Sequence, residues 1–226
     1  MQRLVGGGLL KPRHKILGDD IAGRVEAVGR NVKQFQPGDE VFGISVFGAF
    51  TEYVCADEKY LALKPASMTF EEAATIPFAA VTALQGLRDK GQIQPGQKAL
   101  IVGASGGVGT FAVQIAKSFG AEITGVCSTR KLDMVRSIGA DEIIDYTQED
   151  FSQKEQRYDL ILAVGGYRSI FDYKRALSPE GIYVCIGGSM AQYFQALFLG
   201  PLISMTGSKK IGVVMPKPNQ KDSVFF

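Results

Sequence analysis

The feature that most constrains this chain is an apolar strand that runs directly into a glycine-rich turn, Lys98–Val102 followed by Gly103–Gly109. Missing side chains let backbone N–H groups approach a phosphate, and the N-terminus of the next helix adds partial positive charge. The sequence therefore predicts a strand, turn and helix that hold a dinucleotide pyrophosphate. The alternative is a tight turn that binds nothing. The residues of this turn that are candidates for such contacts are Ala104, Gly106, Gly107, Val108 and Gly109.

Helical periodicity follows the turn, because apolar residues recur at positions i, i+3, i+4 and i+7 from Val108, and Gly120 fits a C-terminal cap. From Lys98 onward, predicted strands and helices alternate. The strands are expected at 98–103, 122–127, 142–145, 158–163, 182–186 and 210–214, and the helices at 107–119, 130–138 and 169–177. Alternating units of this kind predict an α/β fold with a Rossmann-type doubly wound parallel sheet.

The first part of the chain has a different pattern of residues. Turn signals such as 36–39 separate short strand-like runs at 40–42, 49–55 and 60–63, which is typical of an antiparallel barrel. Residues 67–93 look helical, and Thr69 with Glu72 predicts a capping box. The expected domains are a partial β-rich barrel at 1–66, a helical connection at 67–97 and a dinucleotide-binding domain at 98–226.

Bulk properties exclude several classes of function. The net charge is +2 and both signs are mixed along the chain, so the sequence shows no basic segment of the kind that binds nucleic acid. No apolar run is long enough to span a bilayer. Cys55, Cys127 and Cys185 are far apart and lie in apolar, strand-like stretches, so we expect buried core thiols rather than disulfides. That cysteine usage predicts a cytoplasmic protein.

The end of the second predicted strand favours a phosphorylated coenzyme. An acidic residue there would bond the ribose 2′-hydroxyl of NAD, but Ser128 is followed by Arg130 and Lys131, with no carboxylate before Asp133. A hydroxyl and two cations suit a 2′-phosphate, so we expect NADPH rather than NADH. The alternative is a solvated first helical turn. Tyr146 lies at the end of the third strand. It is either a further contact to the ribose phosphate or a half-buried aromatic residue.

Several motifs, in order and at matching spacing, carry a family resemblance. The chain resembles the medium-chain dehydrogenase/reductase superfamily, in its zinc-free quinone oxidoreductase (zeta-crystallin-like) branch. The resemblance covers nearly the whole chain and implies that the partial barrel is GroES-like. It rests on residues 18–29, 37–43, 48–54, 80–84, 103–109, 139–141, 158–160 and 187–188.

The resemblance implies NADPH-dependent two-electron reduction of quinones, enones or related carbonyls. It assigns Ser128, Lys131 and Tyr146 to the 2′-phosphate. It places Thr82 in the helix that faces the nicotinamide, although a hydroxyl bonded to its own helix backbone is an equal alternative. Tyr53 is the other catalytic candidate, as a proton donor, against the commoner role of a core aromatic residue. The implied lining of the nicotinamide side is Val164, Gly165, Gly166, Ile186 and Gly187.

No metal site is expected. Gly18-Asp19-Asp20 stands where the zinc-dependent relatives carry a zinc-binding histidine, and His14, expected at the surface, has no partner for a hydrolase triad. Conjugated acceptors suit a metal-free site because they spread the arriving charge, and the protein then mainly positions the reactants.

Compared with the family pattern, the chain looks truncated at both ends, with a partial substrate domain. The resemblance also implies a homodimer formed through the last strand, near Ile211 to Val214. Two other hypotheses remain open: a non-catalytic NADP(H)-binding or interaction protein with an incomplete substrate pocket, and a structural fragment without activity.

Overall fold

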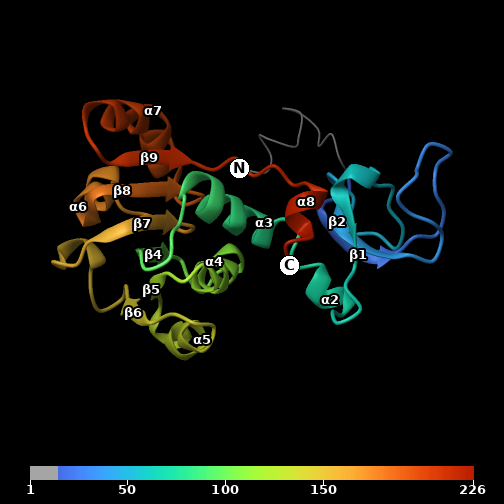
Figure 1. The fold of residues 1–226 in the computed structure, drawn as a ribbon, viewed down its shortest axis with the longest axis horizontal. Helices are drawn as coiled ribbons and strands as arrows, with labels where there is room; N and C mark the ends of the chain where they lie inside the picture. Colours follow the sequence, from blue (N-terminus) through green and yellow to red (C-terminus); the bar gives the residue numbers. More distant parts are fainter. Residues whose placement is uncertain (1–14) are drawn as a thin grey trace. The chain divides into compact units, whose positions relative to one another are not determined.

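The computed structural model describes residues 15–226, which form two compact units (Figure 1). One unit comprises the chain up to Val81 together with Lys217–Phe226, and the other comprises Thr82–Pro216. These units do not coincide with the expected divisions after residues 66 and 97. The boundary falls inside helix α3 (Ala79–Leu84), and the last ten residues group with the β-rich unit.

The first unit is built on a small antiparallel sheet in the order β1-β2-β3. Its strands are β1 (Asp20–Arg24), β2 (Glu40–Ile44) and β3 (Leu61–Leu63). Phe35, Val41 and Leu61 form its apolar cluster. The unit also contains the short helices α2 (Phe70–Ala73) and α8 (Gln220–Ser223). The structure thus confirms a small antiparallel sheet in the first part of the chain.

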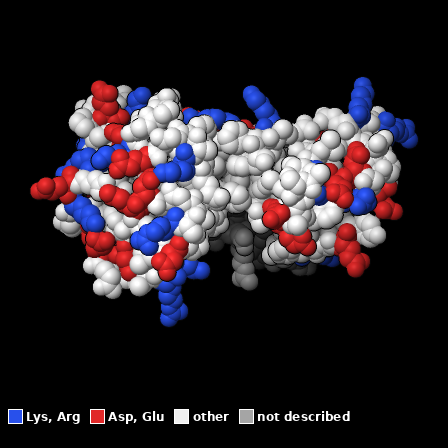
Figure 2. All heavy atoms as spheres, turned by 60° about the horizontal axis from the view of Figure 1, so that its bottom comes forward, with Lys and Arg blue, Asp and Glu red and all other residues white. Residues whose placement is uncertain are grey.

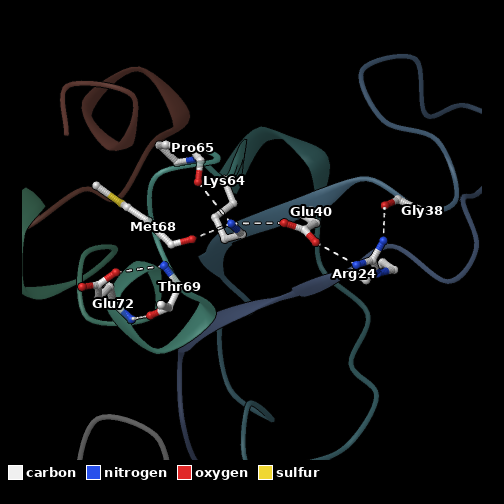
Figure 3. Close-up of polar contacts among 8 residues, drawn as sticks. All are labelled: Arg24, Gly38, Glu40, Lys64, Pro65, Met68, Thr69 and Glu72. Atoms are coloured by element: carbon white, nitrogen blue, oxygen red, sulfur yellow. Dashed lines mark hydrogen bonds and ion pairs between the residues drawn. The ribbon is translucent and has the colours of Figure 1, made fainter.

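A buried lysine joins the strands of this unit to the segment before α2 (Figure 3). The side chain of Lys64 is only 5% exposed, and its Nζ donates to Met68 O at 2.6 Å and pairs with Glu40 Oε2 at 3.1 Å. Glu40 also accepts from Arg24 at 2.7 Å. A buried cation is tolerated only when its donors are satisfied in this way. Immediately afterwards, Thr69 and Glu72 form the predicted capping box.

The strand expected at 49–55 is wrong, because the structure has irregular backbone there. The chain turns sharply just before it: Val46 and Phe47 have φ of 55° and 76°, outside the extended region. Tyr53 is 76% exposed, so it is not a core aromatic residue. Cys55 is also exposed, contrary to the expectation of a buried thiol, whereas Cys127 and Cys185 are buried.

The second unit contains the predicted parallel sheet, with six strands in the order β6-β5-β4-β7-β8-β9. Every neighbouring pair is parallel. In chain order this is 3-2-1-4-5-6, the arrangement of a Rossmann fold, so the predicted fold class is confirmed. The strands are β4 (Lys98–Val102), β5 (Glu122–Cys127), β6 (Glu142–Asp145), β7 (Tyr158–Ala163), β8 (Leu177–Cys185) and β9 (Lys210–Val213).

Helices connect these strands much as periodicity predicts. They are α4 (Gly107–Ser118), α5 (Leu132–Ser137), α6 (Ile170–Ala176) and α7 (Met190–Thr206). Gly120, with φ of 78°, ends α4 as expected. The long helix α7 was not predicted. The region expected to be helical at 67–93 divides into α2, α3 and a π-helical segment, Gln85–Lys90.

The surface shows no large area of one charge on the face drawn in Figure 2, where acidic and basic side chains are interspersed. Within residues 15–226, none of the helices is both long enough and apolar enough to cross a bilayer.

Candidate functional site at the carboxyl edge of the parallel sheet

The glycine-rich turn leaves β4 and is anchored to the neighbouring strand. Gly103 has φ of 84°, and the N–H groups of Gly103 and Ala104 both donate to Val126 O, at 3.1 and 3.0 Å. Gly106 is the N-cap of α4 and has no side chain to cap it. The first N–H groups of a helix have no acceptor within the helix. The start of α4 therefore presents backbone donors that a ligand can use.

The glycines of this turn have different spatial roles. A Cβ on Gly109 would overlap Gly103 O, so this glycine permits close packing of α4 against the turn. A Cβ on Gly107 would meet nothing within 4 Å, and one on Gly106 would meet only Gly103 O at 3.4 Å. Open space beside unpaired helix donors fits a diphosphate.

The order of the strands reverses between β4 and β7, which is where ligands bind in folds of this type. The N–H groups of Val164 and Gly165 donate to Val102 O, at 2.9 and 3.3 Å. On the next strand, the N–H groups of Ile186 and Gly187 donate to Ala163 O, at 2.9 and 3.2 Å. The structure therefore brings these four predicted residues to one edge, continuous with the glycine-rich turn.

The predicted phosphate contacts lie at the ends of β5 and β6. Arg130 and Lys131 are exposed, and neither forms an ion pair with another residue of the described part, 15–226. Lys131 N donates to Ser128 O at 2.8 Å, which folds the segment into a 3-10 turn. Tyr146 N donates to Cys127 O, and the Tyr146 side chain is 60% exposed. Hydroxyl and cationic groups from two adjacent strand ends are therefore available to a ligand.

Asp145 is a site residue that the sequence argument missed. Its side chain is 8% exposed and accepts from Thr129 Oγ1 at 2.5 Å and from Thr147 Oγ1 at 2.8 Å. The hydrogen bond from Thr129 is the main reason that the pKa of Asp145 lies below its usual value. Asp145 belongs to β6 and lies beside Cys127 of β5, so a search for an acidic residue at the end of β5 does not find it. A carboxylate is thus present, with both oxygens engaged by threonines.

Thr82 is buried on α3, with 1% exposure. Gly86, four residues later, lies against β7 and β8, since a Cβ there would be 3.0 Å from Ile186 Cδ1 and 3.0 Å from Leu162 Cδ1. Residues four apart share one face of a helix. The face that carries Thr82 is therefore the one turned toward the ends of these strands.

The first unit contributes the remaining candidates. Tyr53 lies there with an exposed ring. Asp19 Oδ1 accepts from Phe47 N and Asp20 Oδ1 from Phe78 N, each at 2.8 Å, so these carboxylates hold local backbone. Within residues 15–226, no group of three or more His, Cys, Asp or Glu side chains could hold a metal ion. His14 lies outside the described residues.

The sheet order and the glycine-rich turn at its reversal point define the Rossmann class of dinucleotide-binding folds. Comparison with known families agrees. A model described as "Zinc-binding dehydrogenase" matches residues 107–224, and one described as "Alcohol dehydrogenase GroES-like domain" matches residues 3–66. The chain belongs to the medium-chain dehydrogenase/reductase superfamily, in its quinone oxidoreductase branch.

Curated relatives extend well beyond the matched region. The mouse "NAD(P)H oxidoreductase RTN4IP1, mitochondrial" is 42% identical over 161 residues, which is 66% of this chain and 41% of that protein. The tomato "2-methylene-furan-3-one reductase" is 40% identical over 161 residues, with the same coverage. The chain thus spans about two fifths of the length of these relatives.

Solved structures of similar fold include two quinone oxidoreductases. The enzyme from Coxiella burnetii superposes with a TM-score of 0.82 at 26% identity, covering 99% of this chain and 72% of that chain. The Escherichia coli enzyme, solved in complex with NADPH, has a TM-score of 0.78 at 27% identity, covering 92% of this chain and 67% of that chain.

Proposed function

We propose that this chain belongs to an NADPH-dependent oxidoreductase that reduces a quinone, an enone or a related carbonyl without zinc. One observation carries the proposal: the uncapped start of α4 lies at the reversal point of the sheet, with open space at Gly107. The names of the relatives, which include an NAD(P)H oxidoreductase and an enone reductase, support the same chemistry.

The chain's own residues would hold the cofactor in three parts. The glycine-rich turn would receive the pyrophosphate through its backbone donors. The residues concerned are Ala104, Gly106, Gly107, Val108 and Gly109. The exposed cations Arg130 and Lys131, with Ser128 and Tyr146, receive the 2′-phosphate. Val164, Gly165, Ile186 and Gly187 line the nicotinamide side. Bound NADPH supplies the two electrons, as a hydride.

The engaged state of Asp145 supports the choice of NADPH. An acidic residue selects NAD by bonding the ribose 2′-hydroxyl and repelling a phosphate. The oxygens of Asp145 already accept three hydrogen bonds from Thr129 and Thr147, so most of the acceptor capacity of this carboxylate is used within the protein. Lys131 and Arg130 are left as the charged groups nearest in sequence to the end of β5.

The substrate side would use hydrogen-bond donors in place of a metal. Thr82 would present its hydroxyl beside the ends of β7 and β8. Tyr53, which belongs to the other unit and has an exposed ring, stays a candidate proton donor. A conjugated acceptor needs little more, because conjugation spreads the arriving charge and the proton can come from solvent. Alcohol oxidation needs a general base, and a threonine or tyrosine hydroxyl is not a typical one, which favours reduction over alcohol oxidation.

Two measurements test the proposal. NADPH and NADH fluorescence titrations measure binding, and optical detection of NADPH oxidation with a simple quinone and a simple enone measures turnover. We expect NADPH to bind more tightly than NADH and turnover with at least one acceptor. Binding without turnover on any acceptor would instead support the non-catalytic alternative. Folded protein that binds neither coenzyme would overturn both hypotheses.

We also propose a homodimer through β9. This strand lies at the edge of the parallel sheet, so its outer backbone groups have no partner within that sheet. Sedimentation velocity should then show a dimer, and a monomer at all concentrations would contradict it. The cytoplasmic location stays a prediction, because relatives named as mitochondrial and chloroplastic occur.

A further inference from the structure

Three polar side chains are buried together behind the nicotinamide end of the candidate site. Tyr173 of α6 and Tyr183 of β8 are fully buried, and Gln192 of α7 is 2% exposed. Gln192 Nε2 donates to Tyr183 Oη at 2.5 Å, and the two tyrosine rings pack with centroids 4.7 Å apart. Burying three polar groups costs free energy unless each of them is hydrogen-bonded.

This Tyr173–Tyr183–Gln192 cluster lies directly against two glycine turns. A Cβ on Gly166 would overlap Tyr173 Oη and the amide of Gln192. A Cβ on Gly188 would overlap Gly166 O and would be 2.6 Å from Gln192 Oε1. Gly166 is thus required for space, since polar atoms of the cluster occupy the position of a side chain.

The two turns are also joined to each other. Gly166 and Gly188 form an isolated parallel bridge, and Ser189 N donates to Gly166 O at 3.1 Å. Gly165 and Gly187, the predicted nicotinamide contacts, immediately precede the bridging pair. Whatever fixes the bridge therefore fixes the backbone that faces the cofactor.

Two atoms of the cluster have no hydrogen-bond partner among residues 15–226, Tyr173 Oη and Gln192 Oε1. Burial raises the pKa of both tyrosines well above the usual range, so each phenol keeps its proton and remains a donor. An unpaired buried donor and acceptor in a folded protein calls for an explanation. Apolar side chains of similar size would fill the same space without that cost, so the amide has a role beyond packing.

We propose that Gln192 is a positioning residue, whose buried amide holds the Gly166–Gly188 bridge so that Gly165 and Gly187 are aligned for the nicotinamide. The inference rests on the proposed function, because it assumes that a nicotinamide occupies this edge. Gln192 does not touch the cofactor in this proposal. It acts through the two glycine turns.

Gln192→Leu tests the proposal, with Gln195→Leu as a matched control. Gln195 lies on the same helix, and its Oε1 accepts from Ile170 N at 3.1 Å, so the control removes a hydrogen bond from α7 to a different element. Each variant is titrated with NADPH and with adenosine 2′,5′-bisphosphate, which lacks the nicotinamide. For Gln192→Leu we expect NADPH affinity to fall by about tenfold, because the backbone at Gly165 and Gly187 is no longer aligned for the nicotinamide, with unchanged affinity for the fragment.

A second readout needs no cofactor. Amide hydrogen exchange at Ser189, whose N–H bonds Gly166 O, should be faster in Gln192→Leu, whereas exchange at Gly103 should not change. Tyr183→Phe removes the same hydrogen bond from its other side and should reproduce both effects. If Gln192→Leu does not fold, Tyr183→Phe carries the test.

The outcomes separate the two hypotheses. If the wild type binds NADPH but the variants lose affinity for NADPH and for adenosine 2′,5′-bisphosphate equally, the positioning role is wrong and the proposed function stands. That role is also overturned if Gln195→Leu matches Gln192→Leu, or if exchange at Ser189 is unchanged. Wild-type protein that binds neither ligand would overturn the proposed function and this inference with it.

Discussion

The carbonyl oxygen of Gly103 occupies the space in which a side chain on Gly109 would begin. The two residues lie at opposite ends of the glycine-rich turn, and their contact brings the first turn of α4 against the end of β4. By contrast, Gly107 between them faces open space. Packing thus accounts for Gly109 and leaves Gly107 to be explained by a ligand.

Alanine substitutions should separate these two roles. Gly109→Ala forces a methyl group into the Gly103 carbonyl and should destabilise the fold by about 1–3 kcal/mol, as overpacking does. Gly107→Ala should leave stability unchanged and weaken NADPH binding. Urea unfolding and fluorescence titration measure the two effects. If Gly107→Ala binds NADPH as tightly as the wild type, the pyrophosphate does not bind at this position.

Charge reversal at Lys131 should change the choice of coenzyme. Lys131→Glu places a carboxylate where a 2′-phosphate would bind, so NADPH affinity should fall by at least about tenfold while NADH affinity changes little. Arg136→Glu on α5 is the control, because it makes the same charge change on a residue that pairs with Asp133. If Lys131→Glu lowers the affinities for NADPH and NADH equally, the assignment of Lys131 to the 2′-phosphate is wrong.

Asp145 should make stability depend on acid pH. Its folded pKa lies below the usual 3.8, so its contribution is fully present above about that pH and is lost as pH falls through the lower folded pKa. Asp145→Asn should therefore be less stable than wild type at neutral pH, with the difference shrinking below pH 3.8. Denaturant unfolding of both proteins across this range measures it. A difference independent of pH would show that the charge is not responsible.

Thr82 should affect turnover more than binding. Thr82→Val keeps the shape and removes the hydroxyl, and we expect kcat to fall by about tenfold or more with NADPH affinity unchanged. Thr82→Ser keeps a hydroxyl and should retain most of the activity. If Thr82→Val turns over normally, the hydroxyl serves only its own helix, which is the alternative considered above.

Much of the second unit could be predicted because its signals are local. The strands β4, β5, β6 and β7 and the helix α4 lie within a residue or two of their expected ranges. Periodicity of apolar residues and a glycine cap are properties of neighbouring positions, so they can be read along the chain. The strand expected at 49–55 is wrong for a related reason: strand-forming residues are a local signal, and they do not reveal the irregular backbone that follows the positive φ of Val46 and Phe47.

By itself, the sequence determined the parallel fold, the glycine-rich turn before α4 and the sign of charge after β5, because each depends on residues adjacent in the chain. Only the tertiary structure decided that Asp145 reaches Thr129 from the next strand and that Gln192 lies beneath the turns at Gly166 and Gly188. Those contacts join segments distant in sequence, and strand order and helix packing, not local propensity, bring them within hydrogen-bond distance.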